Sequence, residues 1–184
     1  MKRRALAFLL CAVMAFGLTA CGGGESAPAA DVAEEQTVST EDIKADASDK
    51  DTAIYGAVLS AETKYNGLVD LMAGGNLLEV YDGCKETHSF AQDCWGRIND
   101  QKDDLNEDYV DAAKMYCVQI KNICEHLEDY INDQDMEDLS KAQSGMENLN
   151  ACIIDVVSQR QVYLMAAGFT AEEIDEINSV YATE

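Results

Sequence analysis

The segment that decides the fold reads EDYVDAAKMYCVQIKNICEHLEDYI, residues 107–131. Its apolar side chains recur at steps of three and four residues, with charged side chains at many of the positions between them. This spacing places the apolar side chains on one face of an α-helix, whereas a half-buried strand alternates at every second residue. Asp104, with Glu107 three residues later, is typical of a helix N-terminus. The segment therefore predicts a long amphipathic helix, and its buried face is expected to contain Tyr109, Ala112, Tyr116, Ile120, Ile123, Leu127 and Ile131.

Similar spacing predicts four more helices. We expect them from about Ser48 to Gly74-Gly75, from Asn76 to residues 99–101, from about Asp135 to Gly168, and over a short segment opened by a capping box at residues 170–173. Connections this short require consecutive helices to run antiparallel. The sequence therefore predicts an all-α fold, an up-down four-helix bundle with a short C-terminal helix.

The glycine pair Gly74-Gly75 leaves one alternative open. A single kinked helix could continue through it, which would give three long helices instead of four. However, the apolar face loses its phase at the glycines, and Asn76 with Glu79 has the pattern of a new helix N-terminus. These signals favour a turn at this point.

The N-terminal residues have the order of a secretory signal. Lys2, Arg3 and Arg4 form a positive cluster, and the apolar run over residues 5–17 follows it. Thirteen residues are too few to cross the hydrocarbon of a bilayer, which needs about 20 in a helix. A charged start, a short apolar run and small residues at its end are typical of a signal peptide. We expect residues 1–20 to be that signal.

Residues 18–21, Leu-Thr-Ala-Cys, resemble the lipobox of bacterial lipoproteins. The resemblance implies that a lipoprotein signal peptidase cuts before Cys21, and that Cys21 carries a covalent diacylglycerol and an acyl chain. Since two or more chains hold a protein stably at a bilayer, the resemblance implies a lipid anchor in the cell membrane, facing the extracytoplasmic side. The alternative is an ordinary secretory signal with an incidental cysteine.

The chain after Cys21 divides into two parts by composition. Residues 21–47 contain no aromatic residue and are rich in Gly, Ser, Ala, Glu and Asp. Such a segment buries too little apolar surface to offset its ordering entropy, so we expect a flexible acidic tether. Residues 48–184 contain no proline and carry the helical patterns, and they are expected to form one helical bundle domain.

The charge of the chain limits its partners. Its net charge is −22, and removal of the signal leaves 10 basic and 35 acidic residues, a net charge of −25. A surface this acidic repels nucleic-acid phosphates and anionic lipid headgroups. We therefore expect no nucleic-acid partner, and consider cationic proteins, divalent ions or a cell-wall component instead. Solubility alone would also explain the acidity.

Five cysteines of the predicted domain are interpreted as core residues. A free cysteine packs like a small apolar side chain, and most of these lie on or beside a predicted apolar face. An extracytoplasmic location also permits disulfides, and at least one bridge between helices is the alternative. The five are Cys84, Cys94, Cys117, Cys124 and Cys152.

The sharpest chemical candidate is the sequence CKETH, in which Cys84 and His88 are four residues apart. This spacing places both side chains on one helix face, where they could grip one metal ion. A tetrahedral zinc site needs further ligands from a facing helix. The alternative is a hydrogen-bonded core histidine. A metal- or small-ligand-binding bundle that uses Cys84 and His88 is thus the second function considered.

Enzymatic motifs are weak. QDCWG, residues 92–96, has only the Cys-Trp pair of papain-type proteases, and the one histidine downstream of it is His126. The acidic segment over residues 132–138 lacks the glycine and the distal glutamate of a calcium loop. We therefore predict no catalytic residues and a non-enzymatic binding or interaction module of the cell envelope. A cysteine-dependent envelope enzyme is the third function considered.

Arg160 is the one charged residue on a predicted apolar face, four residues after Val156. We expect its aliphatic stem to lie on the core while its guanidinium reaches water. The alternative is a buried guanidinium paired with an acid.

Overall fold

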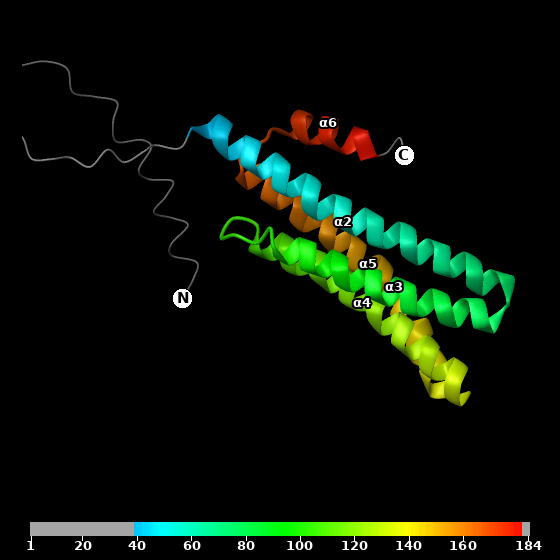
Figure 1. Ribbon diagram of the computed structural model, residues 1–184. Helices are drawn as coiled ribbons and strands as arrows, with labels where there is room; N and C mark the ends of the chain where they lie inside the picture. Colours follow the sequence, from blue (N-terminus) through cyan, green and yellow to red (C-terminus); the bar gives the residue numbers. More distant parts are fainter. Residues whose placement is uncertain (1–38, 182–184) are drawn as a thin grey trace, which may run out of the picture. The chain divides into compact units, whose positions relative to one another are not determined.

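The computed structural model describes residues 39–181, which form a bundle of helices (Figure 1). Within these residues there is no strand, and consecutive long helices run antiparallel (Figure 1). The predicted all-α, up-down four-helix bundle with a short C-terminal helix is confirmed. Its helices are α2 (Thr40–Gly74), α3 (Leu77–Asn99), α4 (Glu107–Asp133), α5 (Met136–Ala166) and α6 (Ala171–Tyr181).

The helix α2 begins at Thr40, so the predicted start near Ser48 is wrong. Ser39 is the N-cap: its hydroxyl accepts a hydrogen bond from the Asp42 N–H at 3.1 Å, and the Asp42 carboxylate accepts one from the Ser39 N–H at 3.4 Å. This capping box satisfies two backbone donors that have no partner within the helix. Residues 40–47, expected in the tether, therefore belong to the bundle, while Cys21 and the rest of the expected tether lie outside the described residues.

The turn between α2 and α3 decides between four helices and three. Gly75 has a φ of 74°, in the left-handed region that glycine adopts without strain, and its N–H donates to the Met72 carbonyl at 3.2 Å. Asn76 then caps α3 by accepting a hydrogen bond from the Leu78 N–H, and Glu79 lies in the first turn of the helix. The chain therefore turns at Gly74-Gly75, as predicted.

The start of α4 differs from the prediction by about one turn. The helix begins at Glu107 rather than at Asp104. Asp103 organises the preceding loop, because its carboxylate accepts hydrogen bonds from the N–H groups of Leu105 and Asn106. The buried Asn106 side chain donates in turn to the Gln101 carbonyl at 2.8 Å. These bonds satisfy the polar groups of a loop packed against the core.

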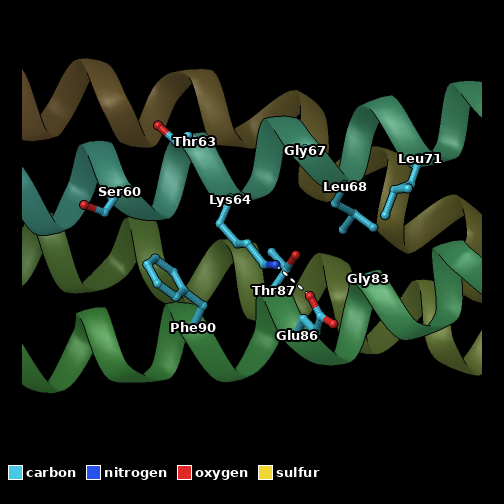
Figure 2. A pocket seen from close by; sticks show the side chains of 10 residues that line it. All are labelled: Ser60, Thr63, Lys64, Gly67, Leu68, Leu71, Gly83, Glu86, Thr87 and Phe90. Carbon is cyan, nitrogen blue, oxygen red and sulfur yellow. Dashed lines mark hydrogen bonds and ion pairs between the residues drawn. The ribbon is translucent and has the colours of Figure 1, made fainter. Parts of the chain in front are cut away.

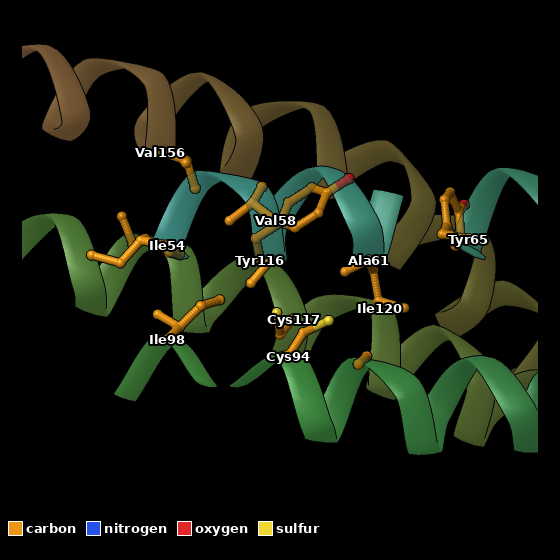
Figure 3. Packing of buried hydrophobic residues seen from close by; sticks show 14 of the residues in the cluster. Ile54, Val58, Ala61, Tyr65, Cys94, Ile98, Tyr116, Cys117, Ile120 and Val156 are labelled. Atoms are coloured by element: carbon orange, nitrogen blue, oxygen red, sulfur yellow. The ribbon is translucent and has the colours of Figure 1, made fainter. Parts of the chain in front are cut away.

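The core lies between the four long helices, and α4 packs extensively against both α3 and α5. The predicted α4 face is confirmed, since its side chains from Tyr109 to Leu127 are buried and Ile131 is partly buried. Figure 3 shows Tyr116, Cys117 and Ile120 of this face against side chains of α2 and α3. On α3 the buried face begins at Val80, whereas Leu77, the first residue of the helix, is exposed.

Two glycines set how closely the helices approach. A Cβ at Gly83 would lie 2.7 Å from the Leu71 Cδ1, and a Cβ at Gly145 would lie 2.7 Å from the Ile123 Cγ1. The first contact joins α3 to α2, and the second joins α5 to α4. At one end of the bundle α2 lies against α5, and toward the other end the α4–α5 pair diverges from the α2–α3 pair (Figure 1). Within residues 39–181 no helix is both long and apolar enough to span a membrane.

Candidate functional site

Arg160 forms a buried ion pair, so the expectation that its guanidinium reaches water is wrong. The Arg160 side chain is 4% exposed and that of Asp51 is 2% exposed. The Arg160 Nε donates to Asp51 Oδ1 and its Nη2 donates to Asp51 Oδ2, both at 2.7 Å. This bidentate geometry joins α5 to α2 through charge-assisted hydrogen bonds. The alternative considered for Arg160, a pair with an acid, is the one observed.

Three further side chains complete the network around this pair. The Arg160 Nη1 donates to Asn178 Oδ1 at 2.6 Å, and the Tyr109 hydroxyl donates to Asp51 Oδ1 at 3.1 Å. The guanidinium carbon lies 4.1 Å from the ring centroid of Tyr55. Burial lowers the pKa of Arg160, but the hydrogen bonds and charge of Asp51 outweigh that effect and raise it. A buried charge with this many partners serves the structure by joining α2, α4, α5 and α6.

The five described cysteines are free thiols, and four of them are buried in the core. The interaction with the neighbouring Cys84 thiol, together with burial, raises the pKa of Cys124. Burial also raises the pKa of Cys117, to about 12, and that of Cys94. Since the thiolate is the reactive form, this environment opposes nucleophilic chemistry. The geometry therefore favours the core-packing interpretation.

The structure places Cys84 and His88 in different surroundings. Cys84 is fully buried against Cys124, whereas the His88 side chain is 33% exposed and its Nε2 lies 2.9 Å from Glu125 Oε1. Within residues 39–181, no group of three metal-ligating atoms includes either residue. The predicted pair thus shares a helix face without converging on further ligands.

A groove of about 570 Å³ runs between α2 and α3 (Figure 2). Its walls include Leu68 and Leu71 of α2 and Phe90 of α3. The Lys64 ammonium and the Glu86 carboxylate form an ion pair at 2.8 Å across it (Figure 2). The groove is lined mainly by apolar surface and is crossed by the Lys64–Glu86 ion pair. Its polar groups do not converge on one point, as they would in a site that orients a small ligand.

The outward side of α5 is unusually apolar. From residue 148 to residue 170 the only charged residues are Asp155 and the buried Arg160, although 26% of the chain is charged. Four large apolar side chains in this segment are between 46% and 69% exposed. We call them the α5 outer face: Ile154, Val157, Val162 and Met165.

Sequence reasoning missed a cluster near the α4–α5 turn. His126 and Asp129 lie in the last part of α4, and Asp138 lies in the first turn of α5. One ligand atom from each lies within 4.8 Å of the other two. The three-residue step between His126 and Asp129 was a visible signal, but the third member depends on the geometry of the turn.

Comparisons with known proteins do not identify a relative: no family model matches the chain, and no curated protein or solved structure matches it significantly. The function must therefore be argued from the residues and their geometry.

Proposed function

We propose that the protein is a lipid-anchored, non-enzymatic binding module of the bacterial cell envelope, and that the α5 outer face binds a partner protein. The anchor is the acylated Cys21 that the lipobox resemblance implies. The observation that carries the binding role is the α5 outer face, an exposed apolar surface almost free of charge on a highly acidic chain. Exposed apolar surface of this kind is typical of protein interaction sites.

The position of these side chains supports one continuous surface. Ile154, Val157 and Met165 recur at steps of three and eight residues, so they lie within one side of the helix, with Val162 beside them. The side of the same helix that faces the core contains the buried Val156, Arg160 and Leu164. Within residues 39–181, the apolar character of the outer side therefore does not result from packing against the bundle core.

The α5 outer face is held in place before any partner arrives. Arg160, within this segment, is fixed to Asp51 of α2 and to Asn178 of α6. The α5–α6 connection is fixed as well, because Gly168 adopts a φ of 95° and Thr170 and Glu173 form the predicted capping box. A preorganised surface loses little conformational entropy on binding.

Charge selects the chemistry of the partner. A second copy of the chain would bring another large negative charge to the same contact, and that repulsion opposes self-association. We therefore assign the α5 outer face to an envelope protein with an apolar ridge flanked by basic residues, which complements both the apolar side chains and the acidic surroundings.

Site-specific crosslinking in intact cells tests this function. A photoreactive residue in place of Val162 is compared with one in place of Met115, an equally exposed apolar residue on α4. We expect a discrete adduct with one basic protein from position 162 only, and we expect Ile154→Glu to abolish it. The absence of an adduct, equal adducts from both positions, an acidic partner, or an adduct with a second copy of this chain would overturn the proposed docking.

The anchor has a separate test with a matched control. Cys21→Ala should release the protein from the membrane fraction and remove the lipid mass, because the sulfur that accepts the diacylglycerol is gone. Cys11→Ala, in the apolar run of the signal, should change neither. Membrane retention of the Cys21→Ala protein would contradict the lipoprotein interpretation.

A further inference from the structure

The cluster near the α4–α5 turn differs from the many acidic groups on this surface, because it contains an imidazole. His126 Nδ1 lies 3.5 Å from Asp138 Oδ1, and Asp129 contributes a second carboxylate within the same 4.8 Å limit. Asp129 is exposed, whereas His126 and Asp138 are partly buried. Two helices thus bring one nitrogen and two oxygen ligands together from opposite sides of a turn.

An independent observation points to a ligand. The His126 Nδ1 atom is itself buried, and it has no hydrogen-bond partner among the described residues. Its separation from Asp138 Oδ1 falls short of hydrogen-bond geometry. Buried polar atoms without a partner are rare, since they lose their hydration without compensation. Ligation of a cation by Nδ1 would supply the missing interaction.

We propose that His126, Asp129 and Asp138 bind a divalent transition-metal ion, of which zinc is the representative. Zinc binds imidazole nitrogen and carboxylate oxygen at about 2.0–2.2 Å, so two ligands of a tetrahedral shell lie about 3.4 Å apart. The His126–Asp138 distance of 3.5 Å is close to this value. Asp129 completes the set by a change of side-chain rotamer, and one coordination position stays open.

The donor set selects the class of metal. An imidazole nitrogen suits zinc and its neighbours in the first transition row, whereas calcium and magnesium prefer shells made of six or more oxygens. The cluster supplies three protein ligands, one of them nitrogen. Magnesium and calcium should therefore compete poorly at this site, even though they screen the other exposed carboxylates.

Lys141 lies beside the cluster, and its ammonium competes with a bound cation for the Asp138 carboxylate. The Lys141 ammonium lies 3.3 Å from Asp138 Oδ1 and 2.9 Å from Glu137 Oε1. When a dication binds Asp138, repulsion moves this ammonium away from the shared oxygen, and its contact with Glu137 can persist. Removal of the Lys141 charge should therefore strengthen metal binding.

The cluster is separate from the proposed docking surface. Asp138 precedes Ile154 by sixteen residues on the same helix, a distance of about 24 Å along its axis. The cluster lies where α4 turns into the start of α5, whereas Ile154 and Arg160 lie in the C-terminal half of α5. Failure of either proposal therefore leaves the other standing.

Calorimetric titration of the purified full chain with Zn²⁺, at physiological salt and with excess Mg²⁺, tests the site. We expect one equivalent of zinc to bind. His126→Gln and Asp138→Asn should each weaken zinc binding at least about tenfold, the loss that follows even from removing an outer-shell partner of a metal ligand. Lys141→Gln should tighten it. The matched control is His88→Gln, because His88 is the only other histidine of the chain.

The control also separates this site from the pair that the sequence suggested. Unchanged zinc affinity in His88→Gln supports the site, and loss of binding in His88→Gln but not in His126→Gln overturns it in favour of Cys84 and His88. Weak binding at many sites, or equal loss in both histidine variants, also overturns the proposal. If His126→Gln does not fold, the exposed Asp129→Asn replaces it. In wild type, zinc should shift the NMR signals of the His126 ring and leave those of His88 in place.

Discussion

Two pairs of polar side chains that join neighbouring helices, Asp51–Arg160 and His126–Asp138, differ in how completely their polar atoms are satisfied. The Asp51–Arg160 pair is buried, and hydrogen bonds to Asp51 and Asn178 engage all three guanidinium nitrogens. The His126–Asp138 pair is partly exposed, and its Nδ1 has no hydrogen bond among the described residues. We call Asp51–Arg160 the closed pair, because its polar atoms are satisfied within the protein. We call His126–Asp138 the open pair, because His126 Nδ1 can still bind a ligand.

The surroundings explain this difference. The guanidinium of Arg160 lies beside the rings of Tyr55 and Tyr181, which contact each other edge to face, and Asn178 of α6 accepts one of its hydrogen bonds. Water cannot solvate a charge there, so an incomplete network would be strongly unfavourable. Near the α4–α5 turn the His126 side chain is 33% exposed, and it lines a groove that also contains the polar side chains of Asn122 and Lys141. An incomplete pair is tolerated at that end.

The largest effect should come from breaking the closed pair. Arg160→Met leaves the Asp51 carboxylate buried without its counter-charge, and this should lower the free energy of unfolding by about 3–5 kcal/mol. Chemical denaturation measures the change. The control is the double variant Asp51→Leu with Arg160→Met, which removes both charges and should recover much of the loss. A single variant within about 1 kcal/mol of wild type would show that the pair does not hold the helices together.

Alkaline pH should weaken the same end of the bundle. Burial and the charge of Asp51 raise the pKa of Tyr109, and burial raises the pKa of Tyr163 to about 12. A tyrosine with a raised folded-state pKa contributes stability fully below about pH 10, its unfolded value, and that stability is lost as pH rises toward the folded-state pKa. The expected loss is about 1.4 kcal/mol per pH unit for each such tyrosine. Denaturation at increasing pH measures the slope.

Tyr109→Phe is the control for the alkaline prediction. The variant loses the hydrogen bond to the charged Asp51 carboxylate, so it should be less stable at neutral pH by about 1.5–3 kcal/mol. It should also have one titrating group fewer, and its stability should fall less steeply above pH 10. An unchanged slope would contradict the assignment of the alkaline effect to Tyr109.

A smaller effect should follow from removing the hydrogen bond that α6 makes to the Asp51–Arg160 pair. Asn178→Ala removes the hydrogen bond from the Arg160 Nη1, and bonds to charged groups contribute about 1.5–3 kcal/mol. Asn148→Ala, an exposed polar residue in the middle of α5, serves as the control and should change stability by less than about 0.5 kcal/mol. Equal effects of the two variants would mean that the hydrogen bond from α6 does not stabilise the Asp51–Arg160 pair.

The sequence predicted those features that depend on local spacing. The faces of α2, α4 and α5 follow from steps of three and four residues, and the turns at Gly75 and Gly168 follow from the left-handed backbone that glycine adopts. The start of α2 was missed because residues 40–47 have few large apolar side chains. The capping box at Ser39 and Asp42 was nevertheless present in the sequence.

Features that depend on distant residues were not predictable in the same way. Asp51 and Arg160 are 109 positions apart, and no spacing rule links them. The choice between a solvated and a buried guanidinium required the position of α6, which covers it. Likewise, the approach of Asp138 to His126 depends on the turn at Gln134, a non-glycine residue with a φ of 57°. The four-residue spacing on one helix placed Cys84 and His88 on the same face. Their neighbours Cys124 and Glu125 belong to α4, so spacing alone could not predict them.

The smallest effect should come from the open pair in the absence of metal. His126→Gln removes a buried nitrogen that has no hydrogen bond, so the free energy of unfolding should change by less than about 0.5 kcal/mol. Added zinc should raise the melting temperature of the wild-type chain and leave that of the variant unchanged, since only a ligand that binds the folded state stabilises it. Without metal, a loss of unfolding free energy as large as that of Arg160→Met would contradict the contrast between the two pairs. It would show that His126 already has stabilising partners within the protein.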